Sequence, residues 1–295
     1  MTTLLKPPAI FRPLNPYFHD SDSVPKDSDP ENRVCTYVLD RIVTGEYSPG
    51  HRINEYEIAR ILKLSKEQVR EAMRNLIYLG LVERIPNKGV RMKHISLRDL
   101  EEIYEARQSI ELEAIRKIAA TITEEQLRQL EKVANLCVFD QTLHDYTGQF
   151  EEIRKSKVPD TSMQLKNIFP YYDTPLKSNP DLQFHLLLVR FMGNRVWEQM
   201  ALTIIPRAII LFQYYFFLLP HSIIKITFQH IIDNVFSLGI KPVPHANIHA
   251  ALAVHDAVQA EALMKEHLRF CYLINKAKIE LYEEILHDQK LHRNK

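Results

Sequence analysis

Apolar residues recur every three or four positions over most of the chain, which predicts a mainly helical protein. Three short helices come first, predicted from Val34 to Val43, from Ile53 to Leu62 and from Ser65 to Leu79. Asn54 and Ser65 are suitable N-caps for the second and third helices, and Gly80 is a suitable residue to end the third.

The pattern changes after Gly80. Leu81 to Ile85 and Val90 to Met92 are short, strand-like segments, and the tight turn Pro86-Asn87-Lys88-Gly89 joins them. Helix, short helix, turn, helix and hairpin in this order predict a winged helix-turn-helix.

From Leu97 onward only helical patterns occur, over about 97–120, 123–138, 179–193, 194–219, 221–238, 246–255 and 256–286. Ser96 and Thr123 are their clearest N-caps. Residues 139–178 lack regular periodicity and are interpreted as an inserted loop. The predicted organisation is a flexible arm (1–33), a winged domain (34–94), an all-helical domain (95–286) and a short tail (287–295).

Composition sets limits on the class of protein. The chain has 295 residues with a formal net charge of +1, so a nucleic-acid surface has to be a local patch. The three cysteines are far apart, which argues against a disulfide framework and suits a reducing cytoplasm. We see no signal peptide at the N-terminus. The very apolar stretch 208–224 is interrupted by Pro220 and His221, so a buried helix or a dimer face is preferred to a membrane span.

The third helix and the hairpin carry the candidate DNA-binding residues. In a winged helix-turn-helix, side chains near the start of the third helix reach base edges, and the wing contacts the phosphate backbone or minor groove. The candidates are Ser65, Lys66, Glu67, Gln68, Arg70 and Arg74 in the helix and Lys88, Gly89 and Arg91 in the wing. On spacing alone, a solvated charged helix in an unrelated small bundle remains the alternative.

A candidate metal site lies in the helical region. Asp181 and His185 are four residues apart, so a carboxylate and an imidazole share one helix face. His245 and His267 follow downstream. An Asp-His₃ set suits Zn²⁺, Ni²⁺ or Mn²⁺, with Zn²⁺ our preferred choice. Spacing alone leaves a purely structural role open, because the chain has 13 histidines.

Residues 34–93 resemble the DNA-binding domain of the GntR family of bacterial regulators. The resemblance rests on Gly45, Pro49-Gly50, Glu55, Ile58-Ala59, Leu62, Ser65, Val69-Arg70-Glu71-Ala72-Met73, Leu76, Gly80-Leu81-Val82, Pro86-Asn87 and Gly89. Two positions depart from the family pattern, because Lys66 stands where Arg is usual and Glu67 where Thr is usual. The first loses bidentate guanine recognition and the second places a carboxylate near phosphates, which predicts an unusual operator or weakened DNA binding.

Residues 97–283 resemble the FCD ligand-binding domain of the FadR-type branch of that family. The resemblance rests on Asp181 to His185, Gly193-Asn194, His245, Asp256-Ala257, Ala260, Met264 and His267. It implies that Asp181, His185, His245 and His267 bind a divalent metal, and that His249 and His255 are surface or supporting residues. Pro244 stands where the family commonly has Glu. The resemblance also suggests that Arg107 faces the ligand pocket, although a surface pair with Glu111 is the alternative.

The resemblance implies a homodimeric, ligand-responsive repressor in the bacterial cytoplasm and nucleoid that binds a palindromic DNA operator. A small carboxylate effector would coordinate the metal and contact Arg107. Two rival interpretations are a metal-independent acyl-chain sensor with a pocket lined by Ile209 to Phe217, and a metal-dependent enzyme. No separate general base stands out, and a DNA-binding domain does not suit a small-molecule enzyme, so we predict that the chain is not an enzyme.

Overall fold

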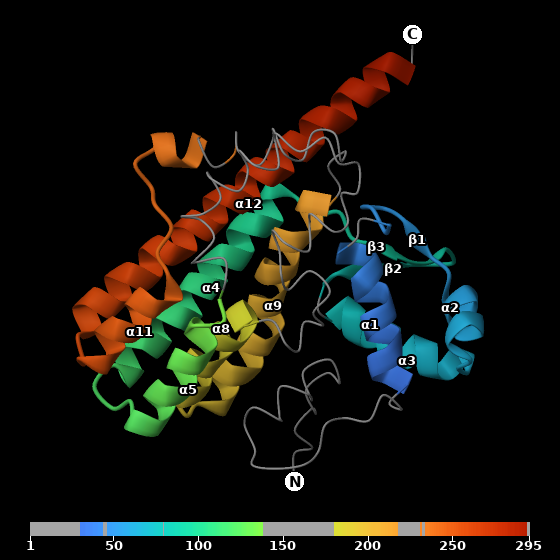
Figure 1. Cartoon of the computed structure of the whole chain (residues 1–295). Coiled ribbons are helices and arrows are strands. Elements are labelled where there is room, and N and C mark those ends of the chain that lie inside the picture. Colours follow the sequence, from blue (N-terminus) through green and yellow to red (C-terminus); the bar gives the residue numbers. More distant parts are fainter. Residues whose placement is uncertain are drawn as a thin grey trace, which may run out of the picture.

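The computed structural model describes residues 30–43, 46–78, 80–137, 180–217, 231 and 234–293. It consists of a small N-terminal domain with a three-stranded sheet, joined to a larger bundle of helices (Figure 1). The predicted arm and the predicted insertion at 139–178 lie outside the described residues, except that the last residues of the arm belong to the first helix.

The N-terminal domain is a winged helix-turn-helix. Its elements are α1 (Pro30–Val43), β1 (Arg52–Ile53), α2 (Glu55–Leu62), α3 (Lys66–Tyr78), β2 (Val82–Ile85) and β3 (Gly89–Met92). The strands are antiparallel in the order β1-β3-β2, and β2 and β3 form the wing. The turn of the wing contains Asn87 and Gly89 with positive φ, as the predicted Gly at the tip requires.

Local capping explains where these helices begin and end. Asn54 accepts hydrogen bonds from two backbone N–H groups of α2, and Ser65 accepts one from Gln68 at the start of α3. At the other end of α3, Gly80 has φ +69° and its N–H donates to the carbonyl of Ile77. The N–H of the next residue, Leu81, donates five positions back, so α3 ends in a Schellman motif.

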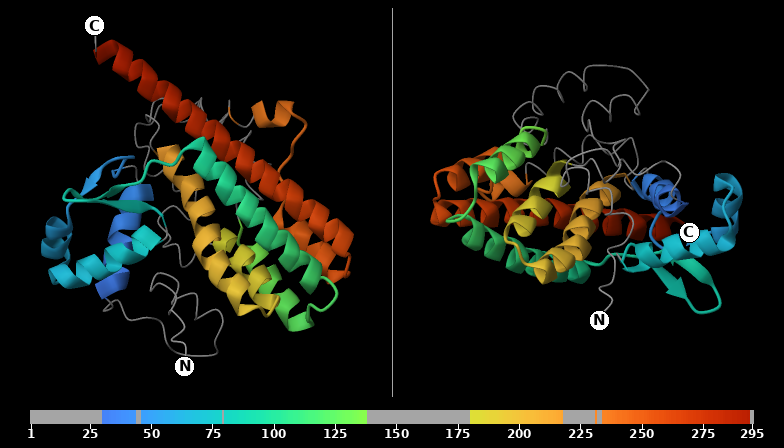
Figure 2. Two further views of the ribbon diagram at one scale, coloured as in Figure 1. Left: turned by 180° about the vertical axis from the view of Figure 1, so that it is seen from behind. Right: turned by 90° about the horizontal axis from the view of Figure 1, so that it is seen from below.

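The helical domain contains α4 (Leu97–Ile118), α5 (Glu124–Ala134), α8 (Pro180–Phe191), α9 (Arg195–Phe217), α11 (His245–Ala253) and α12 (Ala257–Arg293). The long helix α12 lies against α4, and α9 packs against α4 on its other side (Figure 2). α8 contacts α4, α5 and α9, so it lies inside the bundle. Ser96 and Thr123 both form capping boxes at the starts of α4 and α5, as predicted.

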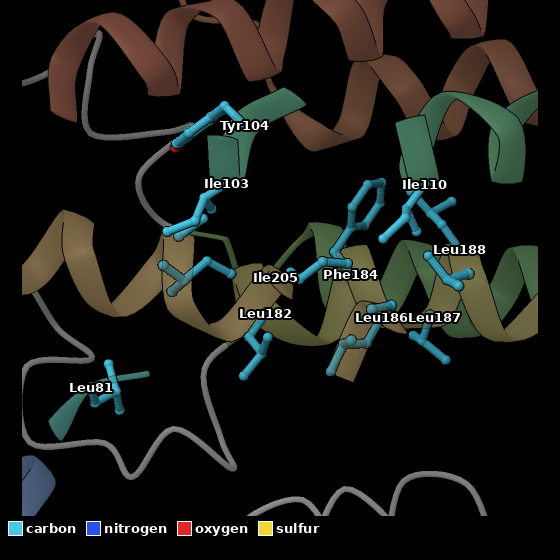
Figure 3. Close-up of a cluster of buried hydrophobic side chains, with 14 of the residues drawn as sticks. Leu81, Ile103, Tyr104, Ile110, Leu182, Phe184, Leu186, Leu187, Leu188 and Ile205 are labelled. Carbon is cyan, nitrogen blue, oxygen red and sulfur yellow. The ribbon is translucent and has the colours of Figure 1, made fainter. Parts of the chain in front are cut away.

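The core of the bundle is centred on α8. Nearly every residue of this helix is buried, and its side chains pack against α4 and α9 (Figure 3). Phe184 and Leu188 are fully buried, together with Ile110 from α4 and Ile205 from α9. Because most of α8 is buried, polar side chains on it such as His185 are held away from water.

The two domains meet where α1 packs against α9 and at two further contacts. Lys93, just after β3, forms an ion pair of 2.7 Å with Asp99 in the first turn of α4. The guanidinium of Arg207 on α9 lies against Gly80, so close that a Cβ at position 80 would be 2.6 Å from one of its nitrogens. The end of α3 and the side of α9 are therefore in direct contact.

Three expectations about boundaries were wrong. α1 begins at Pro30 rather than Val34, because proline is well suited to the first helical turn although its neighbours carry no apolar pattern. Ile53 belongs to β1 rather than to the second helix, because it pairs with Val90 of the wing. α12 continues to Arg293 through the predicted tail, since no glycine or proline stops it.

Two further expectations concern the apolar stretch and the cysteines. Among the described residues no helix has the length and apolar character needed to cross a bilayer. α9 includes the first half of the apolar stretch, and the remainder lies outside the described residues, as does most of the predicted helix over 221–238. The three cysteines are free thiols.

Candidate metal centre and DNA-binding surface

The four residues predicted to bind metal converge in the bundle. Asp181 and His185 come from α8, His245 from the first turn of α11, and His267 from α12. One donor atom from each lies within 4.8 Å of the donor atoms of the other three. The three imidazoles are buried, and the Asp181 carboxylate is partly exposed.

Hydrogen bonds fix the orientation of two of the histidines. The Nδ1 atom of His185 pairs with the Glu111 carboxylate, and its Nε2 faces Asp181 at 3.5 Å and His245 Nε2 at 3.2 Å. His267 Nδ1 is 2.8 Å from the carbonyl oxygen of Val243, and its Nε2 lies 3.8 Å from Cys271 Sγ. Occupying the outer ring nitrogen in this way is the usual means by which proteins orient metal-binding histidines.

Glu111 is itself held by a second buried charge. Its carboxylate pairs with the guanidinium of Arg107, four residues earlier on α4, and the two residues are 0% and 2% exposed. The Arg107–Glu111 ion pair, which the sequence suggested as a surface pair, therefore forms in the interior of the bundle. Burial acts to raise the pKa of Glu111, but the positive charge of Arg107 and the contact with His185 lower it to about 2. Glu111 is thus a permanent carboxylate behind His185.

The donor set fits a divalent transition metal. Burial acts to raise the pKa of Asp181, but contacts with His185 and His245 hold it well below its usual range. A carboxylate and three imidazole nitrogens match a borderline cation such as Zn²⁺. His245 Nε2 lies 3.2 Å from His185 Nε2 and 3.1 Å from the Asp181 Oδ1 atom.

The neighbouring histidines serve other contacts. His249 Nε2 lies 3.2 Å from the carbonyl oxygen of Leu127, and His255 Nδ1 lies 2.8 Å from that of Ala119. Both tie α11 and the turn after it to α4 and α5. Pro244 is the N-cap of α11 and makes no side-chain cap, so its departure from the family pattern does not remove His245 from the cluster.

The recognition helix α3 divides cleanly into two faces. Val69, Ala72, Met73 and Leu76 are fully buried against the domain core. The opposite face exposes all the predicted DNA-binding residues of this helix, namely Lys66, Glu67, Gln68, Arg70 and Arg74. The helix can therefore be packed and still present these side chains to DNA.

Local contacts already engage several of these side chains. The Gln68 side-chain oxygen accepts a hydrogen bond of 2.9 Å from the Ser65 N–H, so Gln68 completes the cap of α3. Glu67 lies 3.9 Å from Arg70 and 4.0 Å from Arg74, and Arg74 also contacts Glu71. The carboxylate of Glu67 thus lies within ion-pair range of both arginines, where it would compete with DNA phosphates.

In the wing, Lys88 is exposed at the tip beside Gly89. Arg91 lies on β3 opposite Glu83, and the two side chains form an ion pair of 2.6 Å. Arg91 is therefore engaged across the strands, whereas Lys88 is exposed at the turn.

Sequence reasoning missed part of the buried site. It considered Glu111 only as a partner of Arg107, although the carboxylate also positions His185. It did not single out Tyr104 of α4 or Asn275 of α12, which are buried and joined by a hydrogen bond of 2.9 Å. A polar residue at apolar spacing on a core helix is the only signal that could have indicated Asn275.

A winged helix-turn-helix joined to a helical bundle is an architecture of DNA-binding transcriptional regulators. Residues 30–92 match the family described as bacterial regulatory proteins, gntR family. An uncharacterized HTH-type transcriptional regulator YdhC of Bacillus subtilis is 34% identical over 154 residues, which are 52% of this chain and 57% of that protein. The HTH-type transcriptional repressor RspR of Escherichia coli is 33% identical over 106 residues, or 36% of this chain and 46% of that protein.

The fold of the whole chain also has solved counterparts. E. coli McbR/YncC superposes with a TM-score of 0.53 at 16% identity, covering 88% of this chain and 98% of that one. A GntR regulator from Rhodococcus gives a TM-score of 0.50 at 18% identity, covering 87% and 97%. At these identities the likeness concerns the fold alone, and the chain spans about half the length of the curated relatives it matches.

Residues 30–92 are thus similar to the DNA-binding domain of the gntR family of bacterial regulatory proteins. The relatives and fold neighbours are regulators rather than enzymes, as the sequence predicts.

Proposed function

We propose that this protein is a metal-containing, ligand-responsive transcriptional regulator. The observation that carries the proposal is the convergence of Asp181, His185, His245 and His267, with His185 and His267 held by outer hydrogen bonds. These residues would hold a divalent cation, with zinc preferred over nickel and manganese. The cation would supply a Lewis-acidic position for the carboxylate of a small organic acid.

Arg107 supports the choice of a carboxylate effector. Its Nε pairs with Glu111, while its Nη2 is buried and has no hydrogen-bond partner. An unsatisfied buried guanidinium nitrogen is costly, so a ligand carboxylate beside it would gain a charge-assisted hydrogen bond. Arg107 would thus contact the ligand one helical turn from the metal.

Helix α4 supplies a route from the sensor to the DNA. Four residues separate it from the wing strand β3, and its first turn is fixed by the Ser96–Asp99 capping box and by Lys93. The same helix carries Arg107 and Glu111 in its middle. A ligand that moves either residue shifts α4, and with it the wing, between arrangements of different DNA affinity. Following the family's habit, we propose repression that the effector relieves.

The proposal includes a homodimer that reads a palindromic operator in the cytoplasm. The start of α9 supports this, because Val196 and Met200 share a face and expose 65% and 46% of their surface. They adjoin Trp197, which lines an open groove of about 430 Å³ together with residues of α4. A second copy would cover these apolar side chains.

Two measurements test the proposal. Elemental analysis of gently purified protein should find close to one metal per chain, and His245→Ala should lose it; less than about 0.2 metal per chain in the wild type would contradict the metal site. Selection of genomic fragments by metal-loaded protein, followed by sequencing, should enrich a short palindrome, and Arg70→Ala should abolish the enrichment. Folded wild-type protein that enriches nothing would contradict DNA-binding regulation.

A further inference from the structure

The facing sides of α4 and α12 carry matching, buried polar stripes that extend from the candidate metal centre into the bundle. On α4 the stripe is Glu111, Arg107 and Tyr104, and on α12 it is His267, Cys271, Asn275 and Lys278, all spaced three or four residues apart. The helices run antiparallel, since Arg116 pairs with Glu261 at one end and Tyr104 with Asn275 further along. The stripes therefore face each other level by level.

Each level lies one helical turn further from the metal. His267 and Glu111 form the first, Arg107 lies at the second, and Tyr104 and Asn275 form the third. At 1.5 Å per residue, Asn275 is about 12 Å along α12 from His267. All these side chains except Cys271 are fully or nearly fully buried.

Two atoms in this column lack a hydrogen-bond partner. The Arg107 Nη2 is a donor and the Asn275 Oδ1 is an acceptor, and both are inaccessible to solvent. The Asn275 amide is fixed because its Nδ2 donates to the Tyr104 hydroxyl, and Arg107 lies 5.7 Å from the centre of the Tyr104 ring. Buried polar atoms normally have a hydrogen-bond partner. A ligand that completes both hydrogen bonds needs an acceptor beside Arg107 Nη2 and a donor, one helical turn further on, beside Asn275 Oδ1.

Building on the function proposed above, we propose that the effector is an elongated hydroxy acid, with its carboxylate at the metal and Arg107 and a distal hydroxyl that donates to Asn275 Oδ1. A second carboxylate does not suit this position, because it would face an acceptor oxygen. An ammonium does not suit it either, since Asn275 lies between the levels of Arg107 and the buried Lys278. A neutral hydroxyl satisfies the amide without either conflict.

The test compares matched acids on metal-loaded, full-length protein. Binding of 4-hydroxybutanoate, 5-hydroxypentanoate and 6-hydroxyhexanoate is measured by calorimetry against butanoate, pentanoate and hexanoate, with succinate and glutarate as the dicarboxylate arm. At least one hydroxy acid should bind the wild type about tenfold tighter than its parent acid, as expected for one buried hydrogen bond. This gain should vanish in Asn275→Ala and shrink in Tyr104→Phe, whereas the parent acids bind all three proteins alike.

Wild-type protein that binds no hydroxy acid tighter than its parent overturns the inference, as does a gain that survives in Asn275→Ala, or tighter binding of the dicarboxylates. Asn275→Leu is a second variant of nearly the same size that lacks the acceptor oxygen, and the gain should vanish in it too, which keeps the test decisive if Asn275→Ala fails to fold. Metal content is measured on the same samples. Protein without metal contradicts the proposed function, whereas metal-loaded protein that ignores the hydroxyl contradicts only the present inference.

Discussion

Replacing Glu111 by glutamine tests the link between the buried ion pair and the metal centre. Glutamine keeps the size of the side chain, but its single acceptor oxygen cannot serve both His185 and Arg107, which the carboxylate contacts with one oxygen each. We therefore expect metal affinity to fall about 10- to 100-fold, which is about 1.4–2.8 kcal/mol. Because Arg107 loses its buried counter-charge, the unfolding free energy of the metal-free protein should also fall by about 3–5 kcal/mol.

Two assays separate these effects. Competition with a chromophoric chelator gives the metal affinity, and urea unfolding with and without metal gives the stability. Glu113→Gln is the matched control on the same helix, since Glu113 is a partly exposed residue paired with Arg116 and Lys117. It should leave metal affinity unchanged and stability within about 0.5 kcal/mol.

If Glu111→Gln binds metal within about twofold of the wild type, Glu111 does not orient His185 and the reasoning is refuted. Should the single variant be too unstable, Glu111→Leu combined with Arg107→Met removes both buried charges together. Such a replacement is often tolerated, and it should keep the fold while still weakening the metal.

Three further predictions concern DNA binding and stability. Glu67→Thr should tighten operator binding about fivefold in a fluorescence-anisotropy titration, because it releases the recognition-helix arginines from a carboxylate; unchanged affinity would show that Glu67 faces away from the DNA. Burial acts to raise the pKa of Asp99, but hydrogen bonds from Lys93 and from Ser96 lower it to about 2. The ion pair of Asp99 with Lys93 therefore stabilises the fold above pH 4, and this stabilisation is lost as the pH falls toward 2. Asp99→Asn should therefore cost up to about 2 kcal/mol in urea unfolding at pH 7, with a difference that narrows below pH 4; a constant difference would refute this. Burial lowers the pKa of Lys278 to about 7, so unfolding free energy should rise as the pH goes from 7 toward 10 by up to a few kcal/mol, and Lys278→Met should remove this rise; an identical pH profile would contradict it.

The sequence predicted the parts of the fold that local chemistry decides. Asn54, Ser65, Ser96 and Thr123 all cap helices where expected, because a cap needs only a side chain and the next three residues. β1 was missed because two residues are too short to show alternation, and its only support is the pairing with β3.

The candidate site was predictable only in part. Asp181 and His185 share a helix face by spacing, but the addition of His245 and His267 rested on family resemblance, since long-range convergence leaves no local pattern. The burial of Arg107 and Glu111 could not be predicted, because an i,i+4 ion pair gives the same pattern on a surface helix. Here the pair is enclosed because α8 lies across α4.

The contact between Arg207 and Gly80 restricts how this protein can be recombined. The recognition helix ends at a residue without a side chain, and the flat guanidinium of α9 occupies the space that a side chain would take. A chimera that joins this helical domain to another winged domain therefore needs glycine at the position after its recognition helix, even if every DNA contact is retained. Conversely, the winged domain carried onto another bundle leaves this space empty. The winged domain and the helical domain can therefore be exchanged only if the new partner preserves the contact between residues 80 and 207.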